Sequence, residues 1–183
     1  MARLERALRS DAHVWRTDLG RTTDPTGIAV ERNVLRHLPV PVAVRYDGER
    51  PVADLLRVVA AGVVAGSSVA VSTPTDLPIA VQTAFSAARV AVTVETEHEW
   101  TTRASGLPAG RVRLVGGDRA ALARATGGRP DLAIYAQPVT EAGRVELLPF
   151  VHEQAVSMTA HRFGTLDGLT DNILPVGQGR GRA

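Results

Sequence analysis

The first hydrophobic residues of the chain recur at helical spacing. They predict an amphipathic helix over residues 1–20 that ends at Gly20. Its apolar face comprises Leu4, Leu8, Ala12, Trp15 and Leu19. This pattern alone leaves two alternatives open, because the face can pack on the chain's own sheet or dock on a partner.

Residues 21–50 show a different period. Val40, Val42 and Val44 alternate as they would on one face of a strand. Pro39 and Pro41 interrupt this run, and a proline has no N–H with which to join the centre of a sheet. We therefore expect residues 21–50 to form an extended lead-in and an edge strand.

Between residues 51 and 137, helical patterns alternate regularly with short runs rich in valine. The predicted helices cover 51–66, 76–88, 98–106 and 118–128, and the predicted strands cover 68–73, 89–95, 111–117 and 131–136. Such alternation is typical of right-handed crossovers between parallel strands. It predicts an α/β fold, a Rossmann-like parallel sheet with helices on both faces.

The alternation of helix and strand ends after residue 137. Residues 144–150 and 155–163 are each interpreted as a strand, so that residues 138–174 form a C-terminal β-flap. In the second strand Val156 and Met158 share an apolar face. The last segment, 175–183, is rich in glycine and arginine and is expected to be disordered.

Composition narrows the possible functions. A chain of 183 residues that is 44% hydrophobic and 4% aromatic suits one α/β domain with an aliphatic core. The net charge is +2, and the excess arginines lie near the two ends, which leaves no basic stripe for nucleic acid. No apolar run is long enough to span a membrane, and no signal peptide is evident. We expect a cytoplasmic protein that binds neither nucleic acid nor membrane.

Several motifs resemble sites but have plainer interpretations. Gly116 and Gly117 follow a strand and precede a helix, as in a phosphate-binding turn, but Asp118 is better interpreted as the helix N-cap. The five histidines lack metal-binding spacing, and no serine lies in a Gly-X-Ser-X-Gly motif. The acidic run 95–99 is interpreted as a solvated helix start. No metal site is predicted.

The run 129–164, with residues 24–45 upstream, resembles the C-terminal region of long bacterial proline utilization A proteins. Those are bifunctional proline dehydrogenase and L-glutamate γ-semialdehyde dehydrogenase enzymes, in which this region follows the two catalytic domains. The resemblance extends over residues 1 to about 174. It implies a non-catalytic domain with an aldehyde-dehydrogenase-like nucleotide fold and a β-flap.

The resemblance also indicates where a cofactor site has been lost. The family's phosphate turn, Gly-Ser-Thr-Glu, matches Pro138, Val139, Thr140 and Glu141, where proline offers no N–H and valine no hydroxyl. The lysine that the family directs to the ribose falls on Ser72 or Thr73, and the chain contains no lysine. It also contains no cysteine, the nucleophile of aldehyde oxidation.

From these residues we expect no catalytic residue and no cofactor in this chain, while FAD and NAD belong to the full-length family enzyme. The expected role is assembly or lid formation on an aldehyde dehydrogenase domain of the same or a partner chain, or self-association through the flap. The expected contact residues are Val145, Leu147, Phe150, Val156, Met158 and Phe163. The alternatives are an NAD-dependent semialdehyde dehydrogenase fragment, a cofactor-binding α/β module, and a detached fragment with no separate role.

Overall fold

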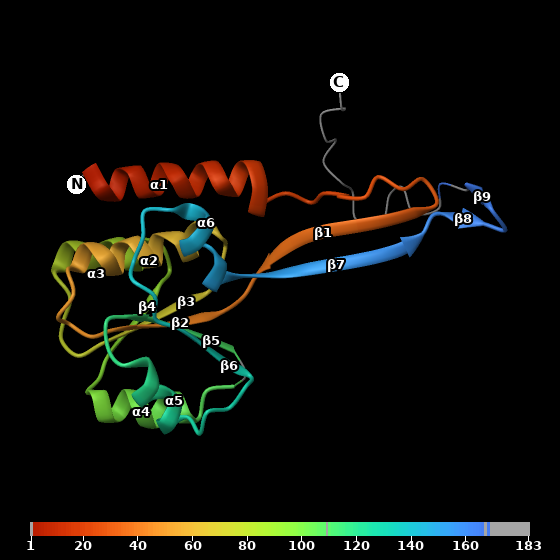
Figure 1. Ribbon diagram of the computed structural model, residues 1–183. Helices are drawn as coiled ribbons and strands as arrows, with labels where there is room; N and C mark the ends of the chain where they lie inside the picture. Colours follow the sequence, from red (N-terminus) through yellow and green to blue (C-terminus); the bar gives the residue numbers. More distant parts are fainter. Residues whose placement is uncertain (1, 109, 167, 169–183) are drawn as a thin grey trace.

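The computed structural model describes residues 2–108, 110–166 and 168, and its body is built on one parallel sheet (Figure 1). The strand order is β4-β3-β2-β5-β6, and every neighbouring pair is parallel. The strands are β2 (Val42–Tyr46), β3 (Val69–Thr73), β4 (Ala91–Val94), β5 (Gly110–Val115) and β6 (Leu132–Tyr135). The predicted parallel α/β fold is confirmed.

Helices cover both faces of this sheet (Figure 1). One face carries α1 (Ala2–Val14), α2 (Val52–Val64), α3 (Ile79–Ala87) and α6 (Gly143–Glu146). The opposite face carries α4 (Glu97–Ser105) and α5 (Arg119–Ala125). None of the helices in the described part of the chain is long and apolar enough to cross a bilayer.

The core consists of two hydrophobic clusters, one on each face of the sheet. Leu55 and Val58 of α2 pack with Phe85 of α3 in the larger cluster. Trp100 of α4 and Leu122 of α5 belong to the smaller one. Strands rich in valine suit this arrangement, because a parallel sheet is buried on both faces.

The prediction that the run of Val40, Val42 and Val44 forms an edge strand is wrong. Val42–Tyr46 forms β2, the central strand of the sheet, and its Val42 and Val44 are buried. The prolines act differently from what the sequence suggested. Pro39 ends a separate strand, and Pro41 lies in the link before β2, so neither has to donate within the parallel sheet.

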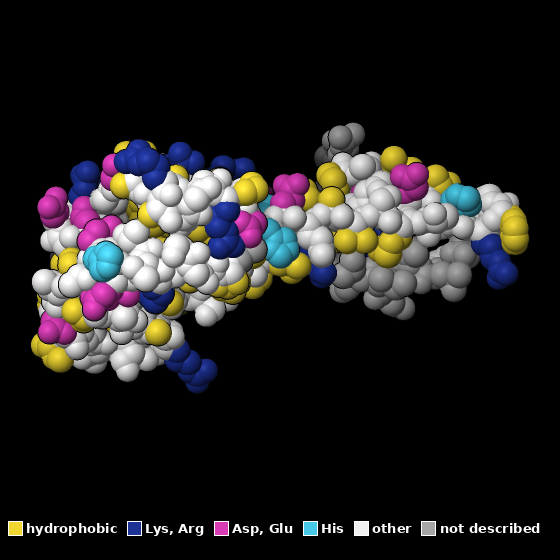
Figure 2. Space-filling view, turned by 90° about the horizontal axis from the view of Figure 1, so that it is seen from below, with side chains coloured by type: hydrophobic (Ala, Val, Ile, Leu, Met, Phe, Trp, Pro, Cys, Tyr) yellow, Lys and Arg dark blue, Asp and Glu magenta, His cyan; other side chains and the backbone are white. Residues whose placement is uncertain are grey.

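The flap is a long antiparallel ribbon that projects from the body (Figure 1). It pairs β1 (Glu31–Pro39) with β7 (Val151–Thr159), from Glu31 opposite Thr159 to Pro39 opposite Val151. A short hairpin, β8 (His161–Arg162) and β9 (Thr165–Leu166), lies at its far end. Figure 2 shows the flap standing clear of the body as a narrow arm with hydrophobic side chains along it and at its tip.

The interpretation of residues 144–150 as a strand is also wrong. This segment forms α6 and a 3₁₀ turn, Leu148–Phe150. Leu147 and Phe150 are fully buried in the larger core cluster. Pro149 cannot donate to a strand ladder but is tolerated at the start of a helical turn, which explains the difference.

Neither of the predicted segments 21–50 and 138–174 forms a single structural unit. Residues 21–50 contribute β1 to the flap and β2 to the body, while residues 138–174 contribute α6 to the body and β7 to the flap. The predicted disordered tail, 175–183, lies outside the described residues.

The predicted N-terminal helix is present as α1, which continues as a short π-helical segment, Trp15–Leu19. It packs closely on α6, where the position of a Cβ on Gly143 would lie 2.8 Å from the backbone N of Asp11 and the backbone O of Ser10. Because both neighbours are backbone atoms, no side-chain rotation can relieve the contact.

Replacing Gly143 with alanine should therefore force α1 away from α6. We expect Gly143→Ala to lower the free energy of unfolding by about 1–3 kcal/mol, the usual effect of overpacking. Urea unfolding followed by circular dichroism measures it. The control is Gly106→Ala, whose added Cβ meets only an ordinary contact of 3.7 Å with the Arg103 carbonyl oxygen. Equal stabilities of the two variants would contradict close α1–α6 packing.

Candidate functional site at the carboxyl edge of the sheet

The turn after β6 contains the residues matched to the family's phosphate turn. Three N–H groups in and directly after this turn donate to side chains of the chain itself. The Thr140 N–H donates to Glu146 Oε2 at 3.0 Å, and the Ala142 N–H donates to Thr140 Oγ1 at 3.1 Å. The Gly143 N–H donates to Ser10 Oγ of α1 at 2.9 Å. These donors are consequently not free to bind a phosphate group.

Arginines from three elements hold the carbonyl groups of the same turn. Arg113 Nη1 donates to the Gln137 oxygen at 2.9 Å, Arg3 Nη2 to the Val139 oxygen at 3.0 Å, and Arg57 Nε to the Thr140 oxygen at 2.9 Å. The turn is therefore held through three of its carbonyl groups as well as through its N–H groups.

Two buried ion pairs support this arrangement. Arg113 Nε and Nη2 both donate to Glu146 Oε1, at 2.9 and 2.7 Å, and both side chains are fully buried. Arg57 makes a two-pronged contact with Asp11 of α1, at 2.6 and 2.8 Å. Burial raises the pKa of the Asp11 carboxyl above its ordinary 3.8, and Arg57 acts in the opposite direction.

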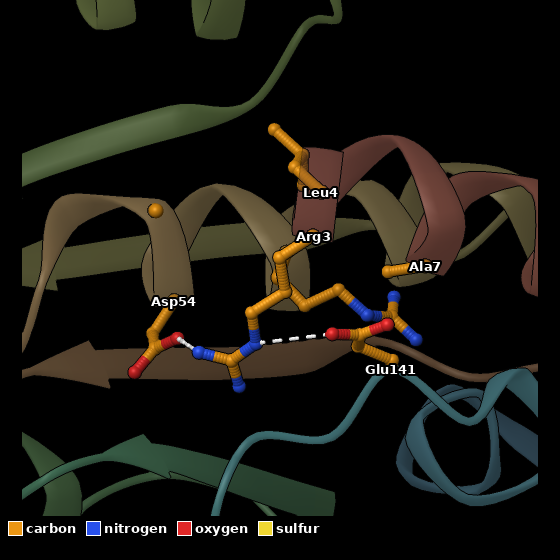
Figure 3. A pocket seen from close by; sticks show the side chains of 7 residues that line it. Arg3, Leu4, Ala7, Asp54 and Glu141 are labelled. Carbon is orange, nitrogen blue, oxygen red and sulfur yellow. Dashed lines mark hydrogen bonds and ion pairs between the residues drawn. The ribbon is translucent and has the colours of Figure 1, made fainter. Parts of the chain in front are cut away.

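The start of α1 clamps the turn from outside (Figure 3). Arg6 binds both carboxylate oxygens of Glu141, at 2.8 and 2.9 Å, while Arg3 bridges Glu141 and Asp54. The hollow between them, which Leu4 and Ala7 also line, measures only about 60 Å³. The hydrogen bonds from Arg6 lower the pKa of Glu141 below its ordinary 4.5. This space is too small for a nucleotide.

A second turn lies where the strand order reverses, between β2 and β5, the place where open α/β sheets usually bind ligands. Asp47, directly after β2, occupies it. Its carboxylate accepts from the N–H groups of Glu49, Arg50 and Gly117, at 2.9 to 3.1 Å. A Cβ on Gly116 would lie 1.6 Å from Asp47 Oδ2, so this glycine leaves room for the carboxylate.

The two turns line one common hollow of about 300 Å³, which contains Gly116 and Gly117 on one side and Pro138 and Val139 on the other. Asp118 caps α5, as predicted, by accepting from the N–H groups of Ala120 and Ala121. These hydrogen bonds lower the pKa of Asp118. The chain's own carboxylates thus occupy donors that would otherwise attract an anion.

The positions matched to the ribose-binding lysine face inward. Ser72 and Thr73 of β3 are buried, where Ser72 Oγ accepts from Arg45 and Thr73 Oγ1 donates to the Thr75 carbonyl oxygen. Both hydroxyls are therefore engaged within the body. No group of three or more potential metal ligands is found within the described residues.

The predicted contact residues are not all at the surface. Leu147 and Phe150 are core residues, Val145 is 43% exposed, and Val156 and Met158 are half-buried on one face of β7. Phe163, at the tip of the flap, is 95% exposed. Of the six predicted contact residues, two therefore lie in the core and four are accessible for contact.

Sequence reasoning missed three residues that shape the site, namely Asp47, Arg113 and Glu146. Asp47 left a local signal, since Asp-Gly directly after a strand is typical of a turn stabilised by the carboxylate. Arg113 and Glu146 left none, because an isolated charge in a hydrophobic run gives no indication of its partner 33 residues away.

Comparison with known proteins gives a specific likeness. The structure of proline utilization A (PutA) from Corynebacterium freiburgense matches 90% of this chain and 14% of that chain, with 27% sequence identity and a TM-score of 0.63. The chain is a PutA-like domain. A Bacillus subtilis protein assigned provisionally to the aldehyde dehydrogenases matches 74% of this chain and 34% of that one, at 18% identity and a TM-score of 0.48.

No protein-family model matches the sequence, and no curated protein matches it with significance. The PutA-like domain is thus recognised through its fold together with 27% identity to one solved structure.

The Arg6–Glu141 contact makes the α1 clamp sensitive to acid. Because the folded-state pKa of Glu141 is lowered, its stabilising effect is present above about pH 4.5 and is lost as the pH falls through the folded value. We expect Glu141→Gln to be less stable than the parent at neutral pH, with a smaller gap in acid. Thermal unfolding across this pH range measures it, and a gap that does not narrow would contradict the clamp.

Proposed function

We propose that this PutA-like domain is a non-catalytic assembly and lid module of a proline-catabolic enzyme, and that its flap packs on an aldehyde dehydrogenase domain. The observation that carries the proposal is the match of 90% of this chain to only 14% of a PutA chain. A segment of that size corresponds to one accessory domain of a much longer enzyme.

The shape of the flap supports a docking role. Phe163 and Leu166 at its tip are 95% and 58% exposed, which is costly for large apolar groups in water unless another surface covers them. Phe163 also has a φ of 51°, as required in the tight turn that it forms with Gly164. Backbone strain that is retained at a large side chain is typical of a functional contact.

The chemistry of the chain supports a partner that performs the reaction. It has no cysteine and no lysine, and the N–H groups of Gly117 and Thr140, which follow two strand ends, are bound by its own carboxylates. In this proposal oxidation of the semialdehyde, and the NAD it uses, belong to the dehydrogenase domain. The flap lies across that domain and helps to enclose the path of the reactive intermediate.

The hollow of about 300 Å³ at the carboxyl edge favours one competing function, a cofactor-binding module. A titration separates the two. We expect NAD or NADP to bind the isolated chain no better than about 1 mM, because the Gly117 and Thr140 N–H groups already bind the chain's own carboxylates and Pro138 offers no N–H to the pyrophosphate. Isothermal calorimetry measures it. A micromolar dissociation constant, lost in a variant that fills the hollow such as Gly117→Trp, would contradict the non-catalytic proposal.

The flap tip allows docking to be tested without disturbing the core. Asparagine tolerates the positive φ of position 163 and removes the aromatic ring. We expect Phe163→Asn to keep the parent's stability while weakening binding to a PutA dehydrogenase that lacks its own terminal domain by about tenfold or more. Surface plasmon resonance measures binding, and thermal unfolding checks stability. Binding equal to that of the parent would show that the tip makes no contact.

The β7 strand provides a second test with a matched control. Met158 lies on the half-buried face of β7, whereas Ser157 is exposed on the other face. We expect Met158→Lys to weaken partner binding more than Ser157→Lys does, because a charge on the apolar face must be desolvated. Deleting all residues after 144 is not a suitable test of the flap, because the deletion also removes Leu147 and Phe150 from the core of the body.

A further inference from the structure

The centre of α1 contacts the body through polar groups. Of the residues in Ala2–Val14, only Ala7 and Asp11 are buried, whereas Leu8, which belongs to the predicted apolar face, is 39% exposed. The Asp11 side chain is completely buried, and Ser10 beside it accepts from the Gly143 N–H of α6. At its centre the helix therefore presents a carboxylate and a hydroxyl to the body.

Arg57 of α2 receives this carboxylate, and the body itself orients the arginine. Arg57 Nε donates to the Thr140 carbonyl oxygen at 2.9 Å, and the Thr140 N–H is in turn bound by Glu146. Nη1 and Nη2 of Arg57 form a planar fork, which Asp11 fills with its two carboxylate oxygens at 2.6 and 2.8 Å. A fork of this kind matches the geometry of carboxylates in general.

The charges around the fork are balanced without Asp11. Glu146, the acidic group of α6 on this side, is already bound by Arg113 of β5 at 2.7 and 2.9 Å. Burial raises the pKa of Asp11 and the charge of Glu146 adds to the rise, while Arg57 acts in the opposite direction. The charged Asp11 is thus held at a net cost, as is common for buried ion pairs, so stability alone does not account for the pair.

The hollow beneath the start of α1 gives access to Arg57 (Figure 3). Arg57 lines it together with Ala7, and Arg3 and Glu141, whose side chains are 55% and 36% exposed, lie at its outer side. Its acids are paired, because Arg3 binds both Asp54 and Glu141. A volume of about 60 Å³ is enough for an ion of a few atoms.

We propose that the body contains a binding site for a small carboxylate, which α1 closes with its own Asp11. The fork of Arg57 is the binding group, Asp11 is its internal occupant, and α1 is a strap that keeps other carboxylates out. A free carboxylate binds the fork when the Asp11 side chain is missing or when α1 is moved aside. Otherwise the internal carboxylate wins, because it loses no translational freedom on binding. The site belongs to the body and is independent of docking by the flap.

Removal of the internal occupant tests the site directly. Asp11→Ala leaves the fork of Arg57 without a carboxylate and leaves space beside it. We expect sodium formate to raise the Tm of this variant by about 3–6 °C at about ten times its dissociation constant, with saturation. Sodium chloride of the same ionic strength should have no such effect. Differential scanning calorimetry measures both.

Two further variants assign the effect to the fork. Asp11→Asn keeps the shape of the side chain and leaves no space for formate, whereas Asp11→Ala combined with Arg57→Met keeps the space but lacks the guanidinium. Formate should stabilise neither of them more than chloride does. If Asp11→Ala is unfolded without ligand, refolding in formate but not in chloride supports the proposal equally. An Asp11→Ala chain that formate stabilises no more than chloride, or that stays unfolded in both, would overturn it.

The strap is tested in a chain that keeps Asp11. Gly143→Ala is expected to force α1 away from α6, because the added Cβ meets the backbone of Ser10 and Asp11. Formate should therefore raise the Tm of Gly143→Ala, whereas the parent, whose fork is filled, should respond to formate as it does to chloride. Adding Arg57→Met to Gly143→Ala should abolish the response. Equal responses of the parent and Gly143→Ala would show that α1 does not close the site.

Discussion

The ion pair between Arg113 and Glu146 connects β5, α6 and the turn after β6 at the carboxyl edge of the sheet. Arg113 lies on β5, donates to the Gln137 carbonyl of the turn, and binds Glu146, which in turn accepts the Thr140 N–H. Glu146 ends α6, and α6 supports α1 on one side and the start of the flap on the other. Loss of one partner from a buried ion pair costs about 3–5 kcal/mol of stability. The turn, α6 and the start of the flap are therefore expected to unfold together.

Whether this fold can bind a phosphate depends on which anion its backbone N–H donors already hold. In this chain Asp47, Asp118 and Glu146 each bind backbone N–H groups at strand ends or at a helix start. A carboxylate held within the chain is present at all times and loses no translational freedom on binding, so it competes effectively with a free ligand. In the proposed function, the Rossmann-like architecture serves as a scaffold that supports the flap.

Much of the body was predictable because its determinants are local. Short valine runs bounded by helical patterns specified β3 to β6 and their helices, and the N-cap of α5 followed from Asp118 alone. The position of β2 at the centre of the sheet depends on pairing with strands that come later in the chain, which local patterns do not encode. The pairing of β1 with β7 joins residues more than 100 positions apart, as from Leu38 to His152. The helical character of residues 143–150 was obscured by an alternating pattern that Pro149, in the 3₁₀ turn after α6, contradicts.

The chain passes between body and flap twice at one narrow place. There the Val40 N–H donates to the Phe150 oxygen, and Arg111 Nη1 donates to the carbonyl oxygens of Leu148, Pro149 and Val151. A ribbon of nine residues extends about 30 Å, so a rotation of about 10° at this root moves its tip by about 5 Å. The flap therefore has the geometry of a lever whose root is held by the hydrogen bonds of a single guanidinium.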